Sequence, residues 1–153
     1  MKLVAAALLA TLHLRMPIDG VGPETLKGGF YDAREGHPHE AVDIMAPRNT
    51  AVHAVQDGTI AKLFWSKGGG GNTIYEFDPT NTYAYYYAHL ERYADGIAEG
   101  QHVSTGQVIG YVGTSGNAPP NAPHLHFAIF ELTAAHHWWQ GKAIDPYPFF
   151  ASR

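Results

Sequence analysis

The sequence of 153 residues contains no cysteine. Disulfides, thiolate zinc fingers, iron–sulfur clusters and a lipid-modified N-terminal cysteine are therefore excluded, while the redox compartment stays open. Basic residues are also few: ten Lys and Arg stand against 14 Asp and Glu, which gives a net charge of −4 with His neutral. Because a nucleic-acid binder usually needs a basic face, this balance argues against nucleic acid as a partner.

Long hydrophobic runs are missing as well. Residues 3–12 form the only candidate, an apolar stretch without acids that follows Met1 and Lys2. A membrane span needs about 20 apolar residues, so we expect no stable membrane insertion. The stretch has the form of a secretory signal, although Leu12, Leu14 and Met16 also alternate with polar residues as in a first strand. We expect a leader or first strand over residues 1–12 and an exported domain, in the periplasm, envelope or medium, over residues 13–153.

Glycine, proline and histidine are abundant. The 17 Gly and 10 Pro predict many turns between short elements. Ten His are far more than a chain of this length usually carries, and histidine is the commonest metal ligand and a common general base. With 45% apolar residues, the chain has material for one core. These features predict one domain with a metal site of nitrogen and oxygen ligands.

Short β-like runs separated by turn signals predict a mostly β fold. The runs cover residues 41–46, 50–55, 59–65, 73–77, 83–90, 108–112 and 125–132. Only 91–97 and 133–139 suggest short helices, and in the second we expect the pair Trp138 and Trp139 to cap the core rather than bind a ligand. The pattern favours a single domain built on antiparallel β-sheet, as a sheet or β-sandwich hybrid.

Two clusters carry the histidine chemistry. His39 and Asp43 lie four residues apart, which places them on one face of either a helix or a strand, and the short run that ends at Pro47 favours a strand. His39 also begins a near match to the H-E-x-x-H helix of zincin proteases, but the second His of that motif is absent. His124 and His126 alternate with apolar residues after Pro123, so both imidazoles are expected on one face of a strand.

His89 stands apart at the end of an aromatic run and, taken alone, is more typical of a hydrogen-bonded core residue. Together the three segments offer four histidines and one carboxylate. A catalytic zinc site commonly takes three protein ligands and leaves a position for water, whose pKa the ion lowers towards neutrality. Spare histidines can then move protons. The residues alone do not divide ligands from proton carriers.

The motifs His39-x-x-x-Asp43, Tyr87-Ala-His89-Leu90 and His124-Leu-His126-Phe127, in this order, resemble those of the lysostaphin-like, or LytM-domain, zinc metallopeptidases of peptidoglycan. The resemblance extends over about residues 30–132 and includes the stretches 43–47 and 113–116. It implies a groove on a mostly antiparallel β fold and one zinc ion per chain. It also implies an endopeptidase that cuts stem or cross-link peptides of peptidoglycan.

Carried over by motif, the resemblance makes His39, Asp43 and His126 the zinc ligands. It makes His89 and His124 the catalytic pair that polarises water and stabilises the tetrahedral intermediate. Asn72 would lie near the groove and Tyr31 and Arg34 in a groove wall, without firm roles. His13, His53, His136 and His137 match no site of the family, and we expect His102 in an exposed turn. His37 stands two residues before His39, where it would be either a groove residue or, as we expect, exposed in a loop outside the site. The alternative is a LytM-like module without enzymatic activity that binds zinc or wall peptide and activates another hydrolase. Such members typically lack some of the five residues, and all five are present here.

Two departures from the family pattern stand near the last motif. The segment 117–123 contains three prolines where relatives usually have a short Ser/Thr-Gly link, which bears on substrate specificity. Ala128 occupies a position where many relatives carry Glu, so a contact that supports the ligands is expected to differ. Neither departure removes a predicted ligand, and the oligomeric state is not predicted.

Overall fold

The structure is a computed structural model that describes residues 13–34 and 36–151. The leader expected over residues 1–12 lies outside these residues. The alternative expectation is a first strand that reaches Met16. It requires residues 13–16 to pair in the sheet, but these residues form no strand. The backbone of Leu14 instead donates to Phe149 O, and that of Arg15 donates to Val55 O. The first described residues are thus tied to the end of the chain and to the core.

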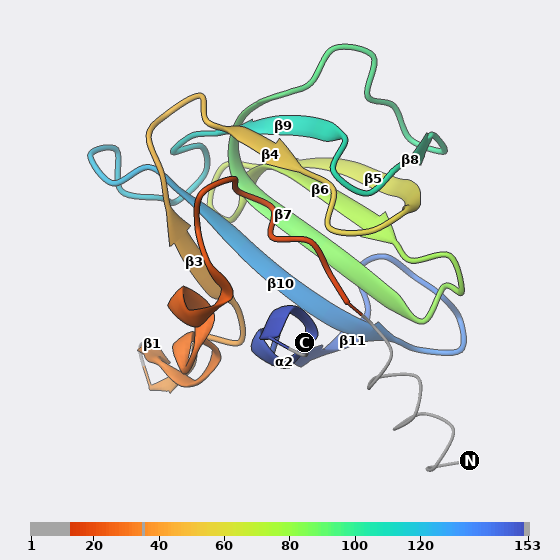
Figure 1. Cartoon of the computed structure of the whole chain (residues 1–153), viewed down its shortest axis with the longest axis horizontal. Helices are drawn as coiled ribbons and strands as arrows, with labels where there is room; N and C mark the ends of the chain where they lie inside the picture. Colours follow the sequence, from red (N-terminus) through yellow and green to blue (C-terminus); the bar gives the residue numbers. More distant parts are fainter. Residues whose placement is uncertain (1–12, 35, 152–153) are drawn as a thin grey trace.

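The fold is mostly β, as expected, with few short helices (Figure 1). The strands are β1 (Ala33–Arg34), β2 (His37–Pro38), β3 (Val42–Met45), β4 (Ala51–His53), β5 (Gly58–Ser66), β6 (Gly71–Phe77), β7 (Tyr83–Tyr93), β8 (His102–Val103), β9 (Val108–Val112), β10 (His124–Leu132) and β11 (Gly141–Ile144). The helical elements are η1 (Pro23–Leu26), η2 (Gly29–Tyr31) and α2 (Tyr147–Ala151). No helix in the described part of the chain is long and apolar enough to cross a membrane.

One large antiparallel sheet organises the molecule. Its main path runs β11-β10-β7-β6-β5-β8, and β3 pairs with β10 while β9 joins β7 to β4. β1 and β2 form a separate small hairpin. The first residues of β10 therefore lie between β7 and β3. Figure 1 shows these three strands side by side.

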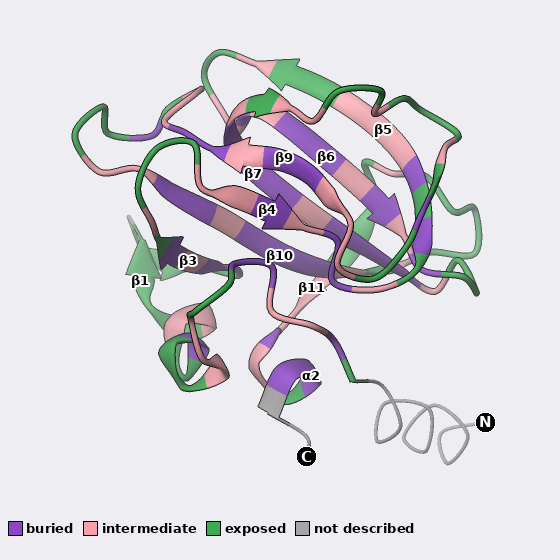
Figure 2. Ribbon diagram, turned by 45° about the horizontal axis from the view of Figure 1, so that its top comes forward, coloured by how far each residue is buried: buried purple, intermediate pink, exposed green. Residues whose placement is uncertain are grey.

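Alternation along β10 explains its two faces. Leu125, Phe127 and Ile129 are buried and belong to the core, whereas His124 and His126 point to the other face. The core face of the sheet packs against α2, where Phe150 contacts Phe127 with ring centroids 5.8 Å apart. The central strands are accordingly buried in Figure 2, while the hairpin β1–β2 and the end of β5 are exposed. The core thus holds β10 in place from one side and leaves its histidine face free.

The two helices expected over 91–97 and 133–139 are wrong. Residues 91–93 continue β7, because Leu90 pairs with Val112 and Tyr93 with Gly110 of β9, and this pairing outweighs local helix preference. Residues 133–140 form the loop between β10 and β11. In that loop His136 has φ 55, which is incompatible with a right-handed helix.

The expectation that Trp138 and Trp139 cap the core is also wrong. Trp139 is 62% exposed. Trp138 packs on Phe64 and Tyr75, with centroid distances of 5.2 and 4.9 Å, on the sheet face that carries His126. The pair therefore covers the outer face of the sheet, and neither residue belongs to the core cluster.

Candidate metal centre

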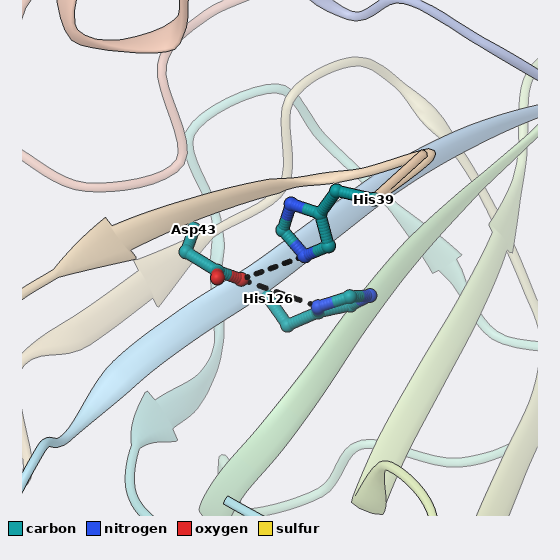
Figure 3. A group of neighbouring side chains, drawn as sticks. All are labelled: His39, Asp43 and His126. Carbon is teal, nitrogen blue, oxygen red and sulfur yellow. Dashed lines mark hydrogen bonds and ion pairs between the residues drawn. The ribbon is translucent and has the colours of Figure 1, made fainter. Parts of the chain in front are cut away.

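Strand register brings the predicted residues together. In the β3–β10 ladder Asp43 stands opposite His126, and in the β10–β7 ladder His126 stands opposite Ala88, next to His89. His39 ends the segment that leads into β3. Figure 3 shows His39 and Asp43, from one segment, meeting His126 of β10 on the surface of the sheet.

Three donor atoms converge on one point. Asp43 Oδ1 lies 3.4 Å from His39 Nε2 and 3.2 Å from His126 Nδ1. One possible ligand atom from each residue lies within 4.8 Å of those of the other two, close enough for one ion to contact all three residues. Two imidazole nitrogens and one carboxylate oxygen are donors that Zn²⁺ accepts, and three protein donors leave a coordination position open. The donor set therefore fits a catalytic zinc site.

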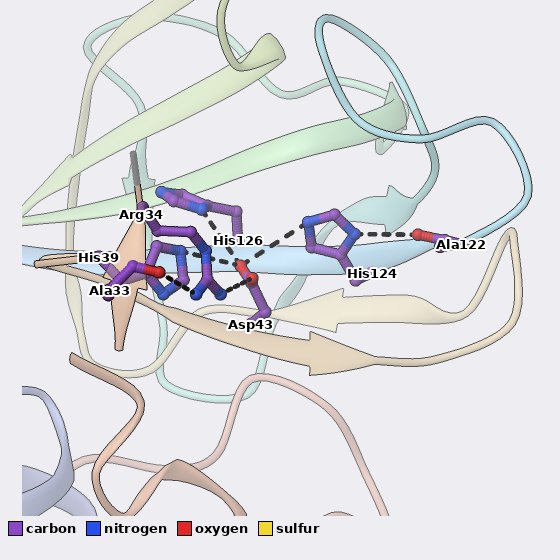
Figure 4. A network of polar contacts seen from close by, with 7 residues as sticks. All are labelled: Ala33, Arg34, His39, Asp43, Ala122, His124 and His126. Atoms are coloured by element: carbon purple, nitrogen blue, oxygen red, sulfur yellow. Dashed lines mark hydrogen bonds and ion pairs between the residues drawn. The ribbon is translucent and has the colours of Figure 1, made fainter. Parts of the chain in front are cut away.

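The two remaining histidines are held through their Nδ1 atoms. His89 Nδ1 lies 2.8 Å from Ser115 O, and His124 Nδ1 lies 3.0 Å from Ala122 O. A carbonyl only accepts, so each Nδ1 carries a hydrogen and each Nε2 is left to exchange protons. The centroids of the two rings are 5.0 Å apart. His124 Nε2 lies 3.7 Å from Asp43 Oδ1, and Figure 4 shows His124 between Asp43 and Ala122.

His89 occupies a strained backbone position. Its φ is 62, in the left-handed region that non-glycine residues seldom adopt, and an extra residue in β7 opposite β6 marks a bulge there. The conformation is fixed by the hydrogen bond from His89 N to Gly70 O at 2.7 Å. Such strain persists only where surrounding contacts impose it, and it concentrates at functional sites.

Asn72 takes part in the scaffold behind His89. Its Nδ2 donates to Leu90 O at 3.2 Å, and its backbone N donates to Ser115 Oγ, which in turn donates to Leu90 O at 2.6 Å. Ser115 therefore links Asn72, the strand after His89 and the His89 ring itself. Close packing here also explains Gly116, where φ is 74 and a side chain would collide with the backbone of the 69–71 turn.

A groove of about 620 Å³ opens over the cluster. It is lined by Arg34, His39, Asp43, Met45, His89, Asn117, Ala118, Pro119, Ala122, His124 and His126. The proline-rich segment 117–123 thus forms part of the wall, and Arg34 reaches in so that its guanidinium lies 3.4 Å from Asp43 Oδ2. Tyr31, predicted in the same wall, is 66% exposed and does not line the groove.

Burial and charge set the protonation of the cluster. Burial would raise the pKa of Asp43, but the hydrogen bond from His126 and the charges of the three nearby histidines outweigh it and hold that pKa at about 2. Burial lowers the pKa of His39 and that of His89 from their ordinary values. The carboxylate is therefore charged and these two imidazoles are neutral near pH 7.

Ala128 leaves room for an aromatic contact. It stands opposite Tyr86 in the β10–β7 ladder and is buried. The Tyr86 ring meets His126 edge-on at 5.8 Å and Phe130 at 6.1 Å, so it spans the space above Ala128. This chain therefore places a tyrosine ring against His126, next to the small side chain of Ala128.

Sequence reasoning missed the parts of the site that are backbone. The carbonyls of Ser115 and Ala122, which orient His89 and His124, have no residue-type signature. The Gly113–Gly116 stretch was the available signal for the first. The six other histidines predicted outside the site are absent from the lining of the groove.

Known proteins match most of this chain. The model of "Peptidase family M23" matches residues 37–146. The chain is 39% identical over 115 residues to the L-Ala–D-Glu endopeptidase of Bacillus subtilis (strain 168), covering 72% of this chain and 33% of that protein. It is 34% identical over 117 residues to lysostaphin of Staphylococcus simulans, covering 76% of this chain and 22% of that protein. The chain thus spans about a fifth to a third of the length of these curated relatives.

Solved structures match the fold. The catalytic domain of lysostaphin from Staphylococcus simulans superposes with a TM-score of 0.65 and 30% identity, covering 94% of this chain and 96% of that one. Csd3 of Helicobacter pylori superposes with a TM-score of 0.69 and 26% identity, covering 91% of this chain and 33% of that one. The fold expected from the sequence is confirmed, and with its family match over residues 37–146 the chain belongs to peptidase family M23.

Proposed function

We propose that this chain is a zinc-dependent endopeptidase that hydrolyses peptide bonds in the stem or cross-link peptides of peptidoglycan. One observation carries the proposal: three residues that can hold one ion, and two histidines held by carbonyls at Nδ1, line the same groove. The relatives support the substrate class, because they include an L-Ala–D-Glu endopeptidase and a peptidoglycan DD-endopeptidase.

The proposed ligands are His39 through Nε2, Asp43 through Oδ1 and His126 through Nδ1, with one zinc ion per chain. When bound, zinc would supply Lewis-acid activation of water and of the scissile carbonyl. Asp43 suits this role because its low pKa keeps it charged, and His39 suits it because burial favours the neutral imidazole that a ligand must be. Arg34 would hold the outer oxygen of Asp43 and orient the carboxylate.

His89 and His124 are proposed as the proton carriers. The carbonyl bound to each Nδ1 fixes the tautomer, so a neutral ring presents a lone pair at Nε2 that accepts a proton from attacking water. A protonated ring then presents N–H at the same atom, which donates to a developing oxyanion or to the leaving amine. The strained, tightly held backbone of His89 keeps its ring in place through both stages.

The groove is proposed to hold an extended peptide. Segment 117–123 forms one wall and Arg34 stands at the other, so the peptide would lie over the cluster between them. Because peptidoglycan lies outside the cytoplasm, the proposal includes export of the domain over residues 13–153 to the cell envelope or beyond.

Digestion of purified peptidoglycan of several cross-link types, followed by mass analysis of the products, tests this function. We expect new peptide termini from at least one type, and none after treatment with a chelator. His102→Ala serves as a control, because His102 is exposed on β8, away from the groove lining. The activator alternative predicts no products from the chain alone and faster digestion by an added wall hydrolase; that outcome would overturn the proposal.

A further inference from the structure

An aromatic surface lies beside the groove on the same sheet face. We define it as the aromatic platform, which consists of Phe64, Tyr75, His137, Trp138 and Trp139. Trp139 is 62% and Phe64 40% exposed, which makes them two of the five large hydrophobic side chains exposed in the described chain. None of its members is needed for the chemistry proposed above. Exposed aromatic side chains that touch one another form a candidate binding surface.

The platform is firmly built. Trp138 rests on Phe64 and Tyr75 and stands at 83° to Trp139, with 5.5 Å between ring centroids. His137 stacks on Trp139 at 4.3 Å and 14°. Stacking and packing of this kind hold the exposed rings in defined orientations, so a ligand would not have to order them.

The loop that carries the platform is anchored at a second point. His136 Nδ1 lies 2.8 Å from Asn81 O, which ties the 133–140 loop to the turn between β6 and β7. His136 adopts φ 55 at this contact. The loop therefore folds back over the sheet instead of extending from its end.

The platform continues from the candidate metal centre. The Tyr86 ring contacts His126 at 5.8 Å and Tyr75 at 4.8 Å, and Tyr75 contacts Trp138 at 4.9 Å. An uninterrupted row of rings thus runs from a proposed ligand to the platform. A polymer that places a peptide bond at the metal centre would bring its neighbouring units over these rings.

The residues around the aromatic platform indicate which kind of ligand it would bind. A hollow of about 60 Å³ lies between loop and sheet, lined by Tyr75, Phe130, Trp138, Trp139, Gln140 and Gly141. It has room for a small substituent but not for a ring. Gln140 lines the hollow, and Lys62 Nζ lies 5.6 Å from the Trp138 centroid, so residues that can form hydrogen bonds lie beside the aromatic side chains.

We propose that the aromatic platform is a carbohydrate subsite that binds N-acetylated sugar rings of the glycan strand. The C–H face of a pyranose lies flat against an exposed indole, its hydroxyl groups need the polar border, and an acetamido group matches the small hollow. A protein partner or a lipid surface fits less well, because the platform offers rings and no aliphatic side chain. The proposal rests on the proposed function, since the glycan is the polymer that carries the peptides.

The test uses a ligand without peptide bonds. A tetramer of N-acetylglucosamine is titrated into the full chain in the presence of a chelator, and NMR follows the indole N–H signals of Trp65, Trp138 and Trp139. Trp65 is an internal control: it is 57% exposed but follows Phe64 in β5, so its side chain points to the opposite face. We expect the signals of Trp138 and Trp139 to shift and that of Trp65 to stay in place.

Matched variants complete the test. Trp139→Ala is expected to weaken tetramer binding by about three- to tenfold, as loss of one aromatic stack implies, while Trp65→Ala leaves it unchanged. On intact peptidoglycan Trp139→Ala should raise KM without lowering kcat, and on a short glycan-free peptide it should change neither. Absence of shifts, equal shifts at Trp65, or shifts with the peptide but not the sugar would overturn the proposal. Because the titration needs no catalysis, its result stands apart from the proposed endopeptidase activity.

Discussion

Asp43 and His126 face each other across the β3–β10 ladder, with Asp43 Oδ1 3.2 Å from His126 Nδ1. They lie 83 residues apart in the chain, so sheet register alone brings them together. A slip of one residue would turn one of the two side chains to the core face. The buried alternation of Leu125, Phe127 and Ile129 fixes that register, so core packing directly positions the proposed ligands.

Asp43→Ala is expected to abolish or greatly weaken zinc binding. The change removes one of three protein donors and the negative charge that compensates the ion. Elemental analysis of the purified variant measures the effect, and His102→Ala, which removes an exposed histidine, is the control. Zinc at full stoichiometry in Asp43→Ala would show that the ligand set is wrong.

His89→Ala and His124→Ala are expected to keep zinc and lose turnover. General acid–base groups contribute about 10²–10⁴-fold in rate, and we expect a loss of that order for each variant. Zinc content and peptide cleavage are measured on the same preparations. If either variant loses its metal in step with its activity, the division between ligands and proton carriers proposed here does not hold.

Glu76→Gln is expected to remove the loss of stability that the wild-type protein undergoes as pH rises above about 4.5. Glu76 is fully buried in β6, and burial raises its pKa to about 8, against the hydrogen bond that Tyr87 donates to Oε1. Its Oε2 has no partner among the described residues. The folded chain therefore keeps the proton that the unfolded chain loses near pH 4.5, so wild-type stability falls as pH rises from there to about 8.

Glutamine has the same size, keeps the Tyr87 hydrogen bond and does not titrate. The NH2 group of glutamine finds no partner at the Oε2 position, and this cost does not vary with pH. Relative to the wild type, the variant should therefore gain stability on the order of a few kcal/mol between pH 4 and pH 8. Denaturant unfolding at a series of pH values measures it. Parallel pH profiles for the two proteins would show that Glu76 is not held neutral in the fold.

The strands and the clustered histidines could be predicted because they rest on local patterns. Alternation in 124–129 indicates a strand with two faces, and motif spacing pointed to the five residues that now lie together. The structure of the other segments depends on tertiary contacts. Residues 91–93 became strand because β9 pairs with them, and 133–140 became a loop that folds over Tyr75. Neither partner can be identified from the local sequence.

The positions of Trp138 and Trp139 also could not be predicted from the local sequence. Two adjacent large aromatics usually favour burial, and nothing local indicates that Trp138 would pack on the outer face of the sheet and leave Trp139 exposed. The carbonyls that orient His89 and His124 were equally hidden, because every residue has one. The sequence therefore indicates the proposed catalytic side chains, but not the backbone carbonyl groups that orient them.

The most direct measurement is a zinc titration of the metal-free chain that follows peptide-bond cleavage in peptidoglycan by mass analysis. The account predicts that cleavage is absent without metal, rises with added zinc and saturates at one ion per chain, while Asp43→Ala stays inactive throughout. Cleavage by the metal-free chain, or restoration of Asp43→Ala by zinc at the same stoichiometry, would contradict it.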